Sequence, residues 1–318
     1  MQDVASFIRY RKRQDKVFNL VGMLCTLVGI LTLVLLMGDL LMDGLPRINW
    51  QFLTSFPSRF AGRAGILSAI VGTFCVMLVT VTFAVPLGVA SAVYLEEYAP
   101  KNRITTIIEI NISNLAGVPS IIYGLMALGI IGVFAWLETG LRNSTGWQWS
   151  INPGRSILTA GITLGLLVLP IVIVTTREAL RAIPNAIREA AYAAGATKWQ
   201  VIRYHLLPYS LGGIATGTII AMSRAVGETA PLITIGALTF IGFLPPSPIQ
   251  SEPPFVNVDF LGSQFTVLPI QMFNWVSRPT EDFHRNAAAT GLVLIALTLS
   301  MNAVAIVVRY RVRRKLKW

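Results

Sequence analysis

The chain has 318 residues, of which 54% are apolar and 13% are charged, and its mean hydropathy is +0.64. A soluble domain carries about a quarter charged residues, so this composition excludes an ordinary soluble enzyme, a disordered chain and a secreted disulfide scaffold. The 26 basic and 15 acidic residues give a net charge of +11, and the positions of these charges decide what that charge means.

Six long runs that are almost free of charge divide the chain. Runs of this length without strand-like alternation satisfy their backbone hydrogen bonds in a bilayer only as helices. The sequence therefore predicts an all-α membrane protein. Its six transmembrane helices are expected at residues 17–38, 64–95, 110–137, 156–176, 211–240 and 286–308.

The basic residues give these helices an orientation. One side of the membrane holds 18 Lys and Arg residues in four segments, which are 1–16, 96–109, 177–210 and 309–318. The other side holds seven, in the segments 39–63, 138–155 and 241–285. The positive-inside rule places the first set, with both termini, in the cytoplasm. The prolines of the last external segment favour an extended, ordered loop over a helix.

The same asymmetry explains the net charge as topology and attraction to lipid headgroups, so no nucleic-acid partner is expected. Cys25 and Cys75 lie inside apolar runs without partners at ligand spacing, and no metal site is expected. The chain has no Gly-x-x-x-x-Gly-Lys-Ser/Thr phosphate loop. We therefore expect no ATP hydrolysis, no catalytic residues and no cofactor in this chain itself.

The cytoplasmic loop 177–210 is the most informative segment. Pro184 at a helix start, an alanine-rich turn and Gly195 as a stop predict a surface helix, a break and a second helix. An amphipathic helix at the membrane surface can dock in a groove of a soluble partner. Composition alone also suits an ordinary solvated loop between helices.

The order of residues in this loop resembles the EAA loop of ABC importer permeases. The resemblance rests on Glu-Ala-Ala-x-x-x-Gly at 189–195 and Leu-Pro at 207–208, although His205 stands where the family has an aliphatic residue. It implies that the loop is the coupling element that seats on an ATPase subunit. The coupling residues would be Glu189, Ala190, Ala191, Gly195, Ala196 and Thr197.

Two opposite charges lie inside the fifth run. Arg224 and Glu228 are four residues apart and share one face of a continuous helix, with Arg224 about 20 Å from its cytoplasmic end. They form either a salt bridge that orients the helix or an anion site. A guanidinium holds a tetrahedral oxyanion bidentately, and a neighbouring carboxylate favours an anion that still carries a proton, as phosphate does and sulfate does not.

The surrounding residues resemble phosphate-specific ABC permeases of the PstA type. The resemblance is carried by Ser-Arg-Ala-Val-Gly-Glu-Thr-Ala-Pro-Leu at 223–232 and by the stretches 64–73, 85–98 and 114–124. It runs from about residue 39 to the C-terminus and implies the six-helix bundle of type I ABC importers in a bacterial inner membrane. The implied partners are a second, PstC-type permease in a heterodimer, two ATPase subunits that bind ATP and Mg, and an external phosphate-binding protein.

Asn111 and Asn114 give the third run a polar half, which either lines the substrate path or joins helices together. With Arg224 and Glu228 they are the predicted path residues. Two other functions stay open. One is a permease for another oxyanion, sulfate or molybdate. The other is a secondary transporter that uses Arg224 and Glu228 as a proton relay, which the EAA loop disfavours.

Overall fold

The computed structural model describes residues 2–145, 154–247 and 257–315, and these ranges are helical and contain no strand. Six helical segments within them are long and apolar enough to cross a membrane. They are Tyr10–Arg47, Leu67–Tyr98, Ser120–Leu137, Ile157–Arg181, Lys198–Gly227 and Glu281–Arg311. The predicted six-helix, all-α membrane fold is confirmed. Parts of two predicted external segments, residues 146–153 and the proline-rich 248–256, lie outside the described residues, as do the terminal residues 1 and 316–318.

The first and last helices are longer than the apolar runs that predicted them. Helix α1 covers Gln2–Gly44 and α12 covers Glu281–Lys315, against predicted limits of 17–38 and 286–308. The difference has a simple cause. A helix that crosses the hydrocarbon layer continues into hydrated ends, where charged side chains no longer oppose it.

The centre of the bundle is α6 (Ile157–Arg181), which packs against both α3 (Leu67–Val93) and α9 (Leu207–Gly227). Glycines make the close approach possible. A Cβ atom at Gly161 of α6 would overlap Val79 of α3, and one at Gly217 of α9 would overlap Thr175 of α6. Small residues of this kind let helix backbones approach in a membrane, where apolar burial alone gives little drive for association.

The third predicted span is interrupted, which corrects the continuous run 110–137. Helix α4 covers Arg103–Leu115 and α5 covers Ser120–Thr145. Pro119 causes the break, because in a continuous helix its ring would clash with the carbonyl of the residue four positions earlier. That residue is the last one of α4. The predicted cytoplasmic segment 96–109 is therefore partly helical as well.

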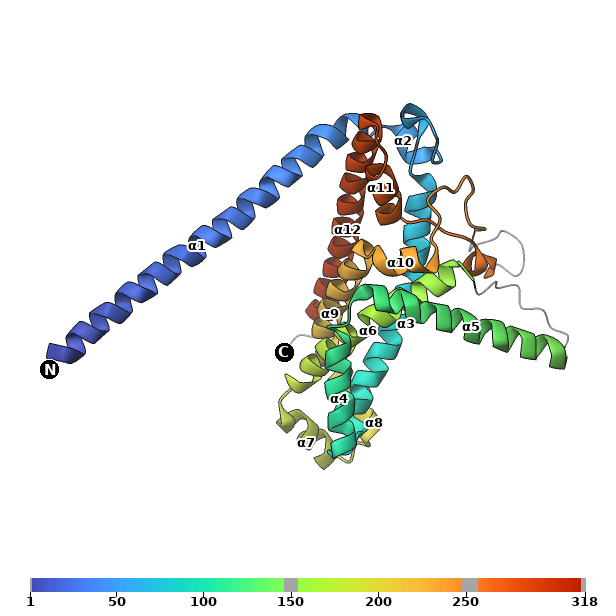
Figure 1. The fold of residues 1–318 in the computed structure, drawn as a ribbon. Helices are drawn as coiled ribbons and strands as arrows, with labels where there is room; N and C mark the ends of the chain where they lie inside the picture. Colours follow the sequence, from blue (N-terminus) through green and yellow to red (C-terminus); the bar gives the residue numbers. More distant parts are fainter. Residues whose placement is uncertain (1, 146–153, 248–256, 316–318) are drawn as a thin grey trace.

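The fifth predicted span, 211–240, is interrupted in the same way. Helix α9 ends at Gly227, and the short helix α10 covers Ala230–Ile235. Pro231 stands four residues after the end of α9 and prevents its continuation for the same steric reason. In Figure 1, α10 lies across the bundle rather than along it. The start of α5 lies at about the same height.

At one end of the bundle, α2 (Trp50–Thr54) and α11 (Leu268–Val276) form a small cap beside the start of α12 (Figure 1). The prediction of an extended loop over 241–285 is wrong for α11. Its Pro269 lies in the first helical turn, where the missing N–H costs nothing. Burial of Trp275 between Phe52 and Phe283, with ring centroids 5.9 and 6.4 Å away, anchors the helix.

Helix α1 leaves the bundle at this capped end and projects away from it (Figure 1), so its apolar stretch is uncovered. One arginine fixes its exit. The Nε of Arg47 donates to Asn286 Oδ1 at 2.6 Å, and its Nη2 donates to the carbonyls of Ala61, Gly62 and Ala64 at 2.9 to 3.1 Å. The exposed apolar surface suits lipid or another membrane helix.

Candidate functional site

The break after α9 determines the surroundings of Arg224. This residue lies in the last helical turn, and its side chain is 40% exposed. Glu228 follows the helix in extended backbone, so the premise that both residues share one helical face is wrong. The two charges still meet, with 3.4 Å between Arg224 Nε and Glu228 Oε1. Within the described part of the chain, Glu228 is the only hydrogen-bond partner of this guanidinium, which leaves its other donors open to an anion.

Both interrupted spans meet beside Arg224. Gly124 of α5 lies so close to α10 that an added Cβ would overlap Thr234 and Pro231. The neighbouring residue, Tyr123, is buried and donates its hydroxyl to the carbonyl of Leu115 at 2.8 Å. The same carbonyl also accepts from the backbone N–H of Val118 at 3.2 Å, because its α-helical partner would be Pro119, which has no N–H. The helix breaks of two spans therefore lie close together, next to the positive charge of Arg224.

The predicted path residues of α4 form no hydrogen bond to this charge among the described residues. Asn111 is exposed and donates its amide to the carbonyl of Ile107 at 2.8 Å. Asn114 is exposed near the end of the same helix. Neither is hydrogen-bonded to Arg224 or Glu228 in the described structure. Of the four predicted path residues, only Arg224 and Glu228 are therefore in direct contact with each other.

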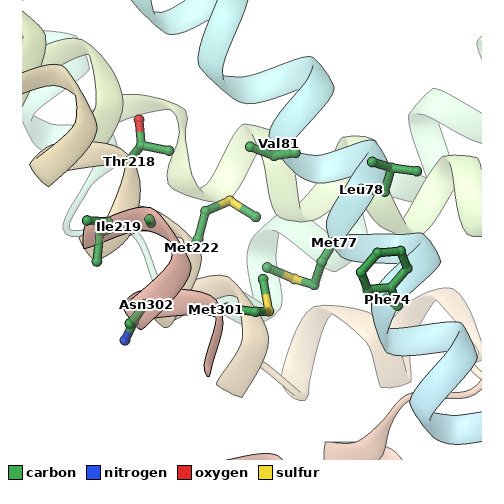
Figure 2. Close-up of a pocket in the computed structure, with 10 residues that line it drawn as sticks. Phe74, Met77, Leu78, Val81, Thr218, Ile219, Met222, Met301 and Asn302 are labelled. Atoms are coloured by element: carbon green, nitrogen blue, oxygen red, sulfur yellow. The ribbon is translucent and has the colours of Figure 1, made fainter. Parts of the chain in front are cut away.

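A cavity between α3, α9 and α12 has the wrong chemistry for an anion. Its volume is about 240 Å³, and Figure 2 shows the side chains of Met77, Met222 and Met301 converging on it from the three helices. The remaining lining is mostly aliphatic, and no charged residue contributes to it. An ion placed there would lose its hydration and gain no charged partner, since Thr218 and Asn302 are the only polar residues in the described lining. Of the two places, Arg224 is therefore the candidate for binding an anion.

The loop between α6 and α9 has the predicted helix–break–helix form. Helix α7 covers Asn185–Ala193, and α8 covers Lys198–Val201. Gly195 turns the chain between them with φ = +81°, a conformation that glycine adopts freely. The side chain of Thr197 caps α8 in a capping box with Gln200.

The predicted coupling residues divide into two faces. Ala191 is buried against the bundle and Ala196 is half-buried. The exposed members are Glu189, Ala190, Gly195 and Thr197. Among these exposed members, Glu189 contributes one carboxylate and the other three are small. His205 is half-buried in a π-helical turn, Ile202–Leu206, that leads into α9.

Sequence reasoning missed an ion-pair network just above this loop. Arg177 and Arg181 of α6 both pair with Glu96, and Arg177 also pairs with Glu109 of α4. Arg188 of α7 pairs with Glu97 at 3.0 Å. The signal was available, because two acidic residues at the end of one apolar run face a basic loop on the same predicted side.

Comparison with known proteins agrees with this geometry. Residues 84–318 match the family described as "Binding-protein-dependent transport system inner membrane component". The chain belongs to this family of ABC transporter permeases, the membrane-spanning components of the inner membrane. The assignment accounts for the six apolar helices.

Two curated relatives match over most of their length. A probable ABC transporter permease protein, YqgI of Bacillus subtilis, is 31% identical over 229 residues, 72% of each chain. A phosphate transport system permease protein, PstA of Haemophilus influenzae, is 28% identical over 289 residues, 91% of this chain and 90% of that one. The resemblance to PstA-type permeases is thereby confirmed.

A solved structure supports the fold. A bacterial ABC transporter involved in the import of the acidic polysaccharide alginate aligns with a TM-score of 0.60 at 17% identity, covering 97% of this chain and all of the other. At this identity the likeness concerns the fold alone. The chain is a type I ABC importer permease in architecture.

Proposed function

We propose that this permease subunit conducts inorganic phosphate and that Arg224 is the anchor for the anion. The observation that carries the proposal is the half-exposed guanidinium at the break after α9, which has one weak partner at 3.4 Å and donors to spare. A guanidinium binds a tetrahedral oxyanion through two parallel N–H···O hydrogen bonds, that is, bidentately. The similarity to a phosphate transport permease supports the same solute.

Glu228 favours phosphate among the oxyanions. Its carboxylate adjoins the guanidinium and repels a fully ionised anion such as sulfate. Hydrogenphosphate keeps a proton near neutral pH and can donate it in a hydrogen bond to the carboxylate. A hydrogen bond from the anion to a half-buried carboxylate favours an anion that carries an O–H donor over one that has none.

We further propose how the subunit is arranged in its complex. The uneven distribution of basic residues supports cytoplasmic termini, with α7 and α8 facing two ATPase subunits that bind ATP and Mg. The cap of α2 and α11 then faces the external phosphate-binding protein. A second, PstC-type permease supplies the other half of the path and covers the open face at Arg224.

Uptake by the assembled transporter tests the proposal. The complex is reconstituted with its partners in liposomes, and ATP-dependent uptake of radiolabelled phosphate and sulfate is measured. We expect phosphate to be preferred and Arg224→Gln to lower its uptake by about tenfold or more, since a charge-assisted bond is lost.

Ile220→Gln is the matched control. Ile220 is exposed one turn before Arg224 on the same helix, so the variant adds an amide there without removing a charge. It should keep most of the uptake. Equal uptake of sulfate by the unmodified complex would contradict the phosphate assignment, and full uptake by Arg224→Gln would contradict the anchor.

A further inference from the structure

The guanidinium of Arg188 differs from that of Arg224 because all of its donors are used. Its Nε and Nη2 donate to Glu97 Oε1 at 3.3 and 3.0 Å. Its Nη1 donates to the carbonyl of Ile183 at 2.9 Å and to Asn185 Oδ1 at 3.1 Å, and its Nη2 also donates to the carbonyl of Leu180 at 3.0 Å. These are five hydrogen bonds for the five N–H groups that an arginine possesses.

These bonds join three elements of the fold. Arg188 belongs to α7, the carbonyls of Leu180 and Ile183 lie at the C-terminal end of α6, and Glu97 lies in the π-helical turn Tyr94–Tyr98 that extends α3. The pair is well covered, with side-chain exposures of 17% for Arg188 and 9% for Glu97. A positive charge is also favourable at a helix C-terminus.

Apolar packing holds the same three elements together. Ala191 of α7 is buried in one cluster with Val93 of α3, Leu180 of α6 and Ile202 of the turn before α9, and Ile187 packs against that cluster. The opposite face of α7 and the Gly195 turn are exposed. Helix α7 is thus attached to the spans on one side and free on the other.

We propose that Arg188 is a positioning residue that makes α7 and the ends of α3 and α6 move as one rigid body. This inference rests on the proposed coupling role of the α7–α8 loop. A displacement of the loop by an ATPase subunit then passes directly into two spans of the bundle. Without the five bonds, α7 slides on its apolar contacts, and ATP is hydrolysed without moving the spans.

Lysine cannot replace arginine in this position. It has three donors on a single nitrogen, whereas the contacts of Arg188 spread over three nitrogens in a planar fork. Arg188→Lys keeps the positive charge but forms fewer hydrogen bonds. The variant therefore separates the effect of the hydrogen bonds that position α7 from the effect of the charge. Arg181→Lys is the matched control, because Arg181 is 56% exposed and its only ion-pair partner in the described part of the chain is Glu96.

The first measurement is phosphate taken up per ATP hydrolysed by the reconstituted complex. Arg188→Lys should lower this ratio by about tenfold while ATP hydrolysis continues, and Arg181→Lys should stay within about twofold of the unmodified complex. Glu97→Gln should lower the ratio less than Arg188→Lys, because the contacts to Leu180 and Ile183 remain. An unchanged ratio in Arg188→Lys would overturn the proposal.

The second measurement does not depend on the solute. Spin labels at Leu87→Cys in α3 and Tyr192→Cys in α7, both exposed positions, report the distance between the two helices after Cys25 and Cys75 are replaced by alanine. The distance should be the same with and without ATP, and should change with ATP in Arg188→Lys. If the distance changes with ATP in the protein that keeps Arg188, the proposed rigid-body movement is refuted. Failure of the unmodified complex to carry phosphate would refute only the proposed solute.

Discussion

Arg224 and Arg188 show how differently one side chain type is used in this protein. Arg188 has a partner for each donor and lies between packed helices, where it can only hold elements together. Arg224 lies at the end of an interrupted span, with Glu228 as its one partner among the described residues and a 40% exposed side chain. An arginine with open donors in a membrane span is costly unless it serves a ligand or a partner subunit.

A double substitution separates the two roles that Arg224 can have. If Arg224 only neutralises Glu228, then changing both to glutamine leaves no unpaired charge and should restore uptake that Arg224→Gln removed. If it anchors the anion, the double variant stays inactive. We expect it to remain at least about tenfold below the unmodified complex, because the charge-assisted bond to phosphate is still missing.

Radiolabelled phosphate uptake, normalised to the amount of assembled complex and its ATPase content, is the measurement. Glu228→Gln alone serves as the control and shows what the carboxylate contributes. Uptake by the double variant close to that of the unmodified complex would make the pair a scaffold. The anion contact would then have to be sought on α4, where Asn111 and Asn114 are exposed.

At the scale of elements, the contact between α5 and α10 holds the two interrupted spans together. Gly124 is essential to it, because any Cβ there overlaps Thr234 and Pro231. Gly124→Val should therefore force α5 and α10 apart and destabilise the protein by about 1–3 kcal/mol, the usual cost of overpacking. Gly129→Val on the same helix is the control, since nothing lies within 4 Å of a Cβ at that position.

Thermal unfolding of the purified complex in detergent measures this effect. The Gly124 variant should unfold at a lower temperature than the Gly129 variant, with β-branching and added volume identical in both. If the two variants unfold together, the packing of α5 on α10 contributes nothing to stability.

The turn between α7 and α8 carries a second prediction for an element. Gly195 is exposed and has φ = +81°, which costs other residues about 1–2 kcal/mol. Gly195→Arg adds both this strain and a bulky charge at the tip of the loop, and should abolish uptake while the permease still inserts. Gly195→Asn should retain most of the uptake, because asparagine tolerates the left-handed conformation.

Co-purification of the ATPase subunits with each variant checks this prediction together with uptake. The arginine variant should lose both, and the asparagine variant should keep both. Normal ATP-driven uptake by Gly195→Arg would contradict the proposed coupling role of the loop.

Sequence reasoning succeeded where the signal was local. Charge-free runs located the six spans, and Pro184 with Gly195 located the helices of the α7–α8 loop. It failed in two different ways. The breaks at Pro119 and Pro231 were signalled locally by the prolines, but hydropathy alone treats the apolar runs around them as continuous. Helix α11 was missed because distant aromatic residues hold it in place.

The candidate site was predictable in part. The residue types of Arg224 and Glu228 pointed to an anion site, and their contact exists, but through extended backbone rather than one helical face. The five bonds of Arg188 were not predictable, because they join residues from three elements whose meeting depends on the whole bundle. Nothing in the local sequence distinguishes Arg188 from the other arginines of the loop.

At the scale of the whole molecule, the orientation is the main prediction. Trp50 of α2 and Trp199 of α8 are both exposed and lie at opposite ends of the bundle. In a background without Cys25 and Cys75, Trp50→Cys should react with a membrane-impermeant maleimide added to intact cells. Trp199→Cys should react only after the membrane is permeabilised. The reverse pattern would overturn the orientation derived from the basic residues.

The anchoring of α1 has a consequence for biosynthesis. This helix leaves the ribosome before the other five spans, and its apolar stretch is so little covered by the bundle that it can enter the bilayer before they exist. Its exit is fixed by Arg47, whose side-chain partner Asn286 comes 239 residues later. The span that precedes the other five therefore receives its complete set of anchoring contacts only when α12 has been synthesised and folded against it.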